Sequence, residues 1–120
     1  MTDIVNLDNI EVGIDLVHIS RFRDIPFDEN DTFYKKNFSK EEIEYCLKFS
    51  DPSKHFAGKF AIKESVKKTL SLKMNMIDIK TEHIDSKPIV KIPSKKFQFK
   101  VSLSHDGNYA IAIVICQKIE

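Results

Sequence analysis

Hydrophobic and polar positions follow two different periods along this chain of 120 residues. Near the N-terminus, "IEVGIDLVHI" alternates Ile10, Val12 and Ile14 with Glu11 and Asp15, which is the period of a half-buried strand. The middle third of the chain has helical spacing instead, and the last third returns to alternation. A strand, then helices, then several strands predicts an α+β fold with helices packed on an antiparallel β-sheet.

Two helices have clear start signals in the middle third. In "NFSKEEIEYCLKF", Ser39 and Glu42 have the spacing of a capping box. In "DPSKHFAGKF", Asp51 is a plausible N-cap residue and Pro52 occupies the first helical position. We therefore expect one helix to begin near residue 40 and a second near residue 52.

Strands are predicted in the last third by shorter patterns. The segments "MIDIKTEH", "PIVKI" and "FQFKVSLS" alternate, and "HDGN" contains an Asp106-Gly107 hairpin signal. The run "YAIAIVIC" that follows is almost continuously apolar, as in a strand that is covered on both faces.

Composition narrows the possible classes of protein. With 42% hydrophobic and 31% charged residues, the chain is typical of globular proteins, and its length suits one domain over residues 1–120. The formal net charge of +1 argues against a generic nucleic-acid binder, so an electrostatic partner must recognise a local patch. Three glycines, in no GxGxxG or Walker pattern, exclude a Gly-rich phosphate loop.

The expected location is the cytoplasm. The first residues have neither the basic nor the apolar region of a signal peptide, and no apolar run is long enough to cross a membrane. Cys46 and Cys116 are isolated, so neither a disulfide framework nor a zinc pattern is present.

One carboxylate stands out in the second helix, "FAGKFAIKESVKKTL". With Phe56 at zero on a helical wheel, Glu64 falls at about 80°, inside an apolar arc, and Lys68 falls at about 120°. One interpretation is an i,i+4 ion pair between Glu64 and Lys68, which would contribute a few tenths of a kcal/mol. The other is a carboxylate in a partly enclosed cleft, where an unpaired charge would need a cation such as a metal ion.

Asp15 and His105 are further candidates for chemistry. Asp15 directly follows an apolar run, where it either caps the next turn or supplies a second carboxylate. Two carboxylates from distant segments, together with waters and substrate phosphates, suit magnesium. His105 lies where a strand enters a turn, and a lone histidine at such a place is most often simply exposed.

Three segments together resemble one family. "GIDLVHISRF", "FAGKFAIKESVKKTL" and "VSLSH" are similar, in this order and at this spacing, to the holo-[acyl-carrier-protein] synthase type of 4′-phosphopantetheinyl transferase. The resemblance extends from about Glu11 to Ile115. It implies a magnesium-dependent enzyme that moves the phosphopantetheine arm of coenzyme A to a serine of an apo acyl carrier protein. Adenosine 3′,5′-bisphosphate would be the second product.

The resemblance also assigns roles to individual residues. Asp15 and Glu64 match the metal ligands of the family, and Lys68 and Lys63 match lysines near the coenzyme A phosphates. His105 matches a histidine that also lies near those phosphates. The general base that accepts the serine proton is either a metal-bound water or a side chain, and Glu64 and His105 are the candidate catalytic side chains.

A carrier-binding surface and an oligomeric state follow from the same resemblance. Arg21 matches a family residue in the region that meets the acidic carrier protein. Arg23, with Lys35 and Lys36 nearby, would complete a basic patch there. Val17 stands where the larger type of the family has a second acid, which favours the small type. Small-type enzymes are usually homotrimers with active sites between subunits.

Some positions depart from the family pattern. "TLSLKMNMI" lacks the glycines that often follow the second helix, and Ser86 replaces a glycine before Lys-Pro. Ile62 replaces a small residue. These departures motivate a second hypothesis, a non-catalytic relative that binds coenzyme A or a carrier protein. A third hypothesis is a structural α+β domain in which Asp15, Glu64 and His105 never converge.

Overall fold

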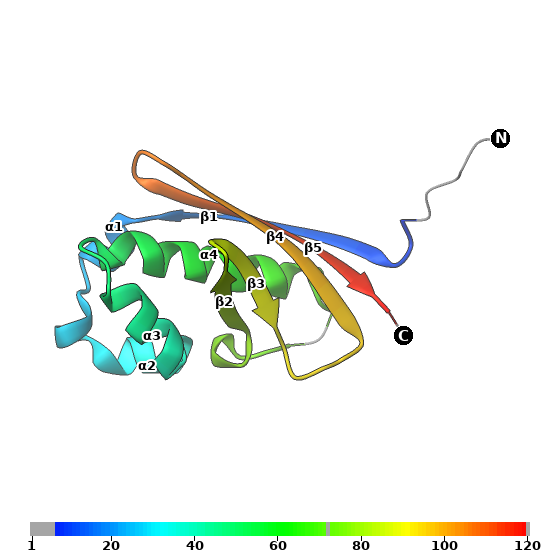
Figure 1. Cartoon of the computed structure of the whole chain (residues 1–120), viewed down its shortest axis with the longest axis horizontal. Coiled ribbons are helices and arrows are strands. Elements are labelled where there is room, and N and C mark those ends of the chain that lie inside the picture. Colours follow the sequence, from blue (N-terminus) through cyan, green and yellow to red (C-terminus); the bar gives the residue numbers. More distant parts are fainter. Residues whose placement is uncertain (1–6, 72, 120) are drawn as a thin grey trace.

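A computed structural model describes residues 7–71 and 73–119 and packs the helices against one face of a long antiparallel sheet (Figure 1). The strands are β1 (Ile10–His18), β2 (Lys80–Ile84), β3 (Lys87–Lys91), β4 (Phe97–Asp106) and β5 (Tyr109–Lys118). The α-helices are α1 (Ser20–Arg23), α2 (Asp31–Asn37), α3 (Lys40–Leu47) and α4 (Pro52–Thr69). The 3₁₀ turns are η1 (Phe27–Glu29) and η2 (Met76–Asp78). The predicted α+β class and antiparallel sheet are confirmed, whereas α2 was not predicted.

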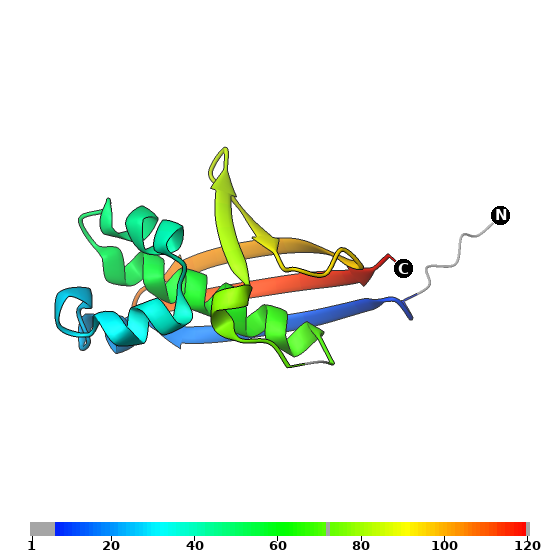
Figure 2. The same cartoon turned by 90° about the horizontal axis from the view of Figure 1, so that it is seen from below.

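The long sheet has the strand order β1-β5-β4, and both pairings are antiparallel. Strands β2 and β3 form a separate hairpin, which projects away from the long sheet in Figure 2. Its turn residues Asp85 and Ser86 both have positive φ, 51° and 68°. Ser86 therefore adopts the left-handed backbone that the family's glycine at this position would adopt without strain.

The apolar residues of β1 lie on the face that the helices do not cover. Gly13 and Val17 face α4 and are buried, whereas Val12, Ile14 and Leu16 are 57%, 57% and 56% exposed. The predicted strand is confirmed, but its apolar residues Val12, Ile14 and Leu16 lie on the outer face of the sheet and not in the core.

Strand β5 has the same division between its two faces. Ala110, Ala112 and Val114 are buried beneath α4, while Ile113 and Ile115 remain 39% and 43% exposed. Coverage of β5 on both faces is therefore not provided by the part of the chain that the structure describes. Together with β1, the strand presents a continuous apolar outer face.

The predicted start of α3 is confirmed in detail. The Ser39 hydroxyl accepts a hydrogen bond from the Glu42 backbone N–H, and the Glu42 carboxylate accepts one from the Ser39 N–H. At the start of α4, Asp51 is the N-cap residue, but its side chain does not cap the helix. The Asp51 carboxylate instead accepts a hydrogen bond from Arg23 at 2.8 Å.

Aromatic rings fill the core on the side of α4 away from the sheet. Phe22 of α1 lies within 6.4 Å, between ring centroids, of Phe38, Phe56 and Phe60. The Tyr34 hydroxyl donates to the Ile25 carbonyl, so the one polar group of this cluster is satisfied. Helix α4 is thus enclosed between the sheet and the smaller helices.

Candidate active site

The site begins with a very close contact between β1 and α4. A Cβ atom placed on Gly13 would lie 2.0 Å from the Ser65 carbonyl oxygen, so only glycine fits there. Asp15 lies two residues further along β1 and therefore on the same face as Gly13. The strand thus delivers the Asp15 carboxylate to the surface of α4.

Lys68, in the last turn of α4, binds β1 directly. Its ammonium group lies 3.1 Å from Asp15 Oδ1 and donates to the Ile14 carbonyl at 2.6 Å. The i,i+4 ion pair between Lys68 and Glu64, one of the two sequence interpretations, is not formed. The lysine forms an ion pair across two elements rather than along its own helix.

Glu64 lies one turn before Lys68 and therefore on the same flank of α4. Its side chain is half-buried, and no described residue forms a hydrogen bond or ion pair with it. Asp15 is bound by Lys68, so two carboxylates and one ammonium group gather on this flank.

These side chains suit magnesium, which takes oxygen ligands and usually keeps waters or substrate phosphates beside one or two carboxylates. Within residues 7–71 and 73–119 there is no group of three or more His, Cys, Asp or Glu side chains that could hold a metal by themselves. Asp15 and Glu64 would therefore share an ion with a phosphate ligand. A site enclosed entirely by protein side chains is not built from the described residues.

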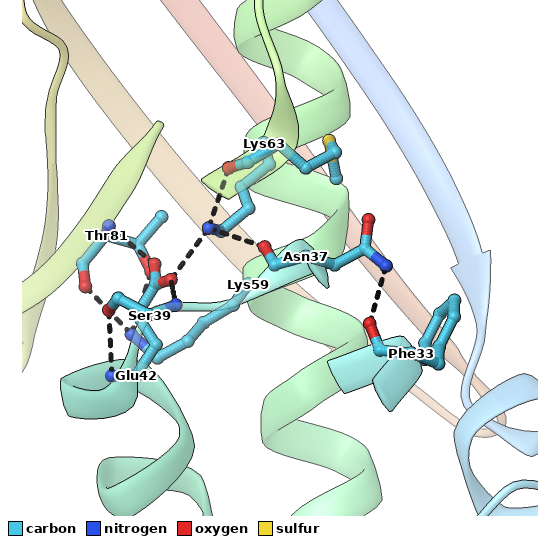
Figure 3. A network of polar contacts seen from close by, with 8 residues as sticks. Phe33, Asn37, Ser39, Glu42, Lys59, Lys63 and Thr81 are labelled. Atoms are coloured by element: carbon cyan, nitrogen blue, oxygen red, sulfur yellow. Dashed lines mark hydrogen bonds and ion pairs between the residues drawn. The ribbon is translucent and has the colours of Figure 1, made fainter. Parts of the chain in front are cut away.

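Lys63 was expected near the coenzyme A phosphates, and the structure corrects this expectation. Its side chain is 0% exposed, and its ammonium group donates to Glu42 and to two backbone carbonyls (Figure 3). With all three donors used inside the protein, Lys63 has none left for a phosphate. Burial lowers the pKa of Lys63, an effect that the Glu42 carboxylate partly offsets.

His105 lies on the opposite flank of α4. Its Nε2 is 3.1 Å from the Lys54 carbonyl oxygen. A Cβ atom placed on Gly58 would lie 3.3 Å from His105 Nε2. The carbonyl can only accept, so Nε2 carries the proton in this contact. Burial lowers the pKa of His105, and the hydrogen bond to Lys54 partly offsets it.

His105 and Asp15 also belong to the two outer strands of the sheet, β4 and β1, which β5 separates. Gly58 and Lys68 are ten positions apart, which corresponds to about 15 Å along the helix axis. Within one chain, the structure therefore brings Asp15, Glu64 and Lys68 to one flank and leaves His105 apart from them.

The expected carrier-binding residues are all exposed, and two of them, Arg23 and Lys35, form ion pairs with acidic side chains. Arg21 stacks over the Phe60 ring, with its guanidinium carbon 5.1 Å from the ring centroid. Arg23 is paired with Asp51, and Lys35 with Asp31 at 3.3 Å. Residues 20–37 contain four basic and four acidic residues, so the segment is not basic overall.

A hollow of about 350 Å³ lies at the C-terminal end of α4, beside Lys68. Thr69, Leu70 and Ser71 contribute to its wall, as does Lys118 of β5. The described residues of the glycine-free segment 70–75 all have negative φ, so their backbone conformations do not require glycine. The absence of glycines thus leaves this end of α4 undistorted.

Sequence patterns missed the residues that surround Lys63. Glu42 was identified only as a helix-capping residue, and Lys59 was not singled out, yet both are almost completely buried. The available signal was the run "FAGKFAI", in which Lys59 stands among small and apolar residues that are typical of a buried helix.

Comparison with known proteins identifies the family of the chain. Residues 11–114 match the model of the 4′-phosphopantetheinyl transferase superfamily. The chain is 35% identical over 108 residues to the holo-[acyl-carrier-protein] synthase of Thermodesulfovibrio yellowstonii, covering 87% of this chain and 95% of that protein. It is 34% identical over 123 residues to the synthase of Syntrophus aciditrophicus, covering 90% and 95%.

Solved structures give the same result. Helicobacter pylori holo-[acyl-carrier-protein] synthase in complex with coenzyme A superposes with a TM-score of 0.78 at 28% identity, over 88% of this chain and 99% of that one. The synthase of Bacillus anthracis, at 24% identity and a TM-score of 0.78 over 90% and 96%, shares the fold. The chain belongs to the 4′-phosphopantetheinyl transferase superfamily.

Proposed function

We propose that this protein is a holo-[acyl-carrier-protein] synthase. It transfers the 4′-phosphopantetheine arm of coenzyme A to a serine of an apo acyl carrier protein and releases adenosine 3′,5′-bisphosphate. The observation that carries this proposal is the position of Lys68 against Asp15, on the same flank of α4 as Glu64, in a chain that is similar to such synthases over nearly its whole length. Coenzyme A is the co-substrate.

Asp15 and Glu64 would hold a magnesium ion through carboxylate oxygens. When bound, the ion neutralises negative charge on the pyrophosphate as the bond to the leaving group breaks. Lys68 lies at the edge of the same site and would add fixed positive charge to the phosphates. Its ammonium group is half-exposed, so it could turn from Asp15 to a phosphate while the magnesium ion takes its place beside the Asp15 carboxylate.

The transfer forms a bond between the serine oxygen and the phosphorus that carries the pantetheine arm. The bond between that phosphorus and the bridging oxygen breaks, and the bridging oxygen leaves with adenosine 3′,5′-bisphosphate. The serine proton goes to a general base, for which Glu64 and His105 are the candidates. Glu64 shares a flank with Asp15, whereas His105 would reach the reaction from a neighbouring subunit.

A homotrimer with active sites between subunits is part of the proposal. The apolar outer face of β1 and β5 supports it, because exposed patches of this kind favour association. The separation of His105 from Asp15 supports it as well, since a second copy could bring a His105 to the flank that carries Asp15 and Glu64. One surface would then serve both assembly and catalysis.

The partner would be an acidic carrier protein that meets Arg21 and Arg23. Because acidic residues interrupt the basic ones here, we expect individual ion pairs to guide docking rather than one broad positive field. None of the described helices has the length and apolar character needed to span a bilayer. We propose a cytoplasmic location, where the unbonded thiols of Cys46 and Cys116 would remain reduced.

The decisive experiment incubates the protein with coenzyme A, magnesium and apo carrier proteins, and follows the carrier by intact mass spectrometry. We expect the carrier to gain the mass of the arm on its serine, and EDTA added before the reaction should prevent this gain. Asp15→Asn and Glu64→Gln should each abolish the shift, while Glu41→Gln, an exposed acid on α3, should retain it. No mass shift on several carriers, including that of the host, would rule out the transferase.

The same material separates the other hypotheses. A non-catalytic relative would bind coenzyme A or a carrier in calorimetry without transfer, and Glu64→Gln would leave that binding unchanged. A structural domain would bind neither. The presence of Asp15, Lys68 and Glu64 on one flank disfavours this last hypothesis.

A further inference from the structure

The Glu42 carboxylate lies at the centre of a buried polar network that joins α4 to the smaller helices and the β2–β3 hairpin (Figure 3). Glu42 is 2% exposed, and its Oε1 accepts from the Ser39 N–H at 2.8 Å and from Lys63 Nζ at 2.7 Å. Its Oε2 accepts from the Thr81 N–H at 2.8 Å and from the Thr81 hydroxyl at 2.5 Å. One carboxylate thus joins α3, α4 and β2.

Lys63 extends the network to two more elements. Besides Glu42, its ammonium group donates to the Asn37 carbonyl at 2.9 Å, at the end of α2, and to the Met76 carbonyl at 3.0 Å, in η2. The three donors point in three directions, and each has a fixed acceptor. Rotation of α4 about its axis, or sliding along it, would break several of these bonds together.

Lys59 adds a second attachment one turn earlier on α4. It donates to the Thr81 hydroxyl at 3.0 Å and to the Thr81 carbonyl at 3.2 Å, and its ammonium group lies 4.6 Å from the centre of the Tyr45 ring. Helix α4 is therefore bound to β2 directly through Lys59 and, one turn later, indirectly through the contact of Lys63 with Glu42. Burial lowers the pKa of Lys59, and nearby acidic groups partly offset it.

The opposite side of α4 is held by contact with the sheet. Ser65 leaves no room for a side chain at Gly13, and its hydroxyl donates to the Ala112 carbonyl at 3.2 Å. Apolar contact between helix and sheet is non-directional, and the Ser65 hydroxyl and the Lys68 ammonium group add the directional bonds on this side. Burying the charges of Glu42 and Lys63 costs free energy, and an apolar pair of similar volume is often equally stabilising. The main contribution of this pair is therefore to fix the orientation of α4.

That direction bears on the proposed metal ligand, because Glu64 directly follows Lys63 in α4. Glu64 itself has no partner among the described residues that would hold it in place. Its position relative to Asp15 therefore depends on the rotation and axial position of α4. The Glu42–Lys63 pair is one of the buried directional contacts that fix both, together with the bonds of Lys59 to Thr81.

We propose that Glu42 and Lys63 are positioning residues, which hold α4 so that Glu64 stays in register with Asp15 for magnesium. This inference rests on the proposed transferase function. Lys63 acts through the helix and does not contact coenzyme A. Removing a group that is hydrogen-bonded to a metal ligand typically weakens metal binding by about 10- to 100-fold; because Glu42 and Lys63 act through the helix, we expect an effect at the lower end of this range.

The test measures coenzyme A binding by calorimetry with and without magnesium, together with the magnesium concentration that gives half-maximal transfer. For Glu42→Gln and Lys63→Met we expect unchanged coenzyme A affinity without magnesium and loss of the gain that magnesium provides. The half-maximal magnesium concentration should rise by about tenfold or more. A Lys63 that contacted phosphate directly would lower the affinity equally with and without the metal, which would overturn the proposal.

Two further variants separate positioning from simple loss of stability. The apolar pair Glu42→Leu/Lys63→Met restores a folded core if either single variant unfolds, and it should still require more magnesium. Val66→Ala creates a cavity on the same helix outside the network, and at a temperature where it is folded it should keep the normal magnesium requirement. An equal rise in Val66→Ala, or a normal requirement in Glu42→Gln, contradicts the inference alone. Absence of transfer in the unmodified protein contradicts the proposed function itself.

Discussion

Lys68 on α4 binds Asp15 on β1, although an acidic residue of its own helix, Glu64, lies one turn away. The contact joins residues that are 53 positions apart in the sequence. It brings the ammonium group to the same flank as the two carboxylates that are proposed to hold magnesium. Among the described residues no cation pairs with Glu64, so its carboxylate oxygens are open to a metal ion.

Replacing Lys68 with methionine should separate catalysis from stability. The ion pair with Asp15 is half-exposed on the lysine side, so its loss should cost less than about 1 kcal/mol of unfolding free energy. Loss of a fixed charge at the phosphates should lower kcat/KM for coenzyme A by about a hundredfold or more. Lys67→Met, an exposed neighbour on α4, is the matched control for both measurements, and an equal rate loss in the two variants would contradict the assigned role.

The outer face of the sheet should direct assembly. Leu16→Glu places a charge in the middle of the apolar face of β1, so we expect a folded protein of lower mass by light scattering after gel filtration. Ile84→Glu, equally exposed but on the β2–β3 hairpin, should leave the mass unchanged. An unaltered mass in Leu16→Glu would show that the subunits associate elsewhere.

Active sites shared between subunits should allow two inactive variants to complement each other. Asp15→Asn and His105→Ala, co-expressed in equal amounts, should form mixed trimers in which some sites combine an intact Asp15 with an intact His105. Random assembly makes about one site in four intact, so transfer should recover to about a quarter of the normal rate. A co-expressed mixture as inactive as its components would mean that each chain builds its own site.

Gly13 should tolerate no side chain. A Cβ would lie 2.0 Å from the Ser65 carbonyl oxygen, and neither backbone can move without separating β1 from α4. We expect Gly13→Ala to lose more than about 3 kcal/mol in urea unfolding, or to fail to fold. Gly107→Ala, in open space but with φ of 58°, should lose only about 1 kcal/mol. Equal losses in the two variants would contradict the proposed close approach.

His83 should make the fold sensitive to acid. Burial, with the charges of Lys59 and His55, lowers the pKa of His83 from 6.5 to about 4. Between these values the unfolded chain binds the proton and the folded chain does not, so stability falls as pH drops from about 6.5 towards about 4. His83→Gln should reduce the difference in urea midpoint between about pH 8 and about pH 5. An unchanged difference would exclude His83 as its source.

Local sequence signals predicted the elements with short-range causes. The capping box of Ser39 and Glu42 begins α3, Pro52 is the first residue of α4, and Asp106-Gly107 lies at the β4–β5 turn. Helix α2 was missed because its seven residues form too short a segment for a helical period to emerge. The sequence could not predict which face of β1 is buried, because alternation shows only that the two faces differ and not which one the helices cover.

The sequence by itself determined the order of elements, the helix and turn signals, the position of Glu64 within an apolar arc and the motifs shared with a transferase family. Each of these depends on residues within a few positions of one another. Only the tertiary structure decided that Lys68 reaches the candidate site while Lys63 is buried against Glu42, and that His105 lies on the far flank of α4. Lys63 and Lys68 lie on either side of Glu64 in the sequence. Their roles differ because Lys63 pairs with Glu42 of α3 and Lys68 with Asp15 of β1, and both partners are distant in the sequence.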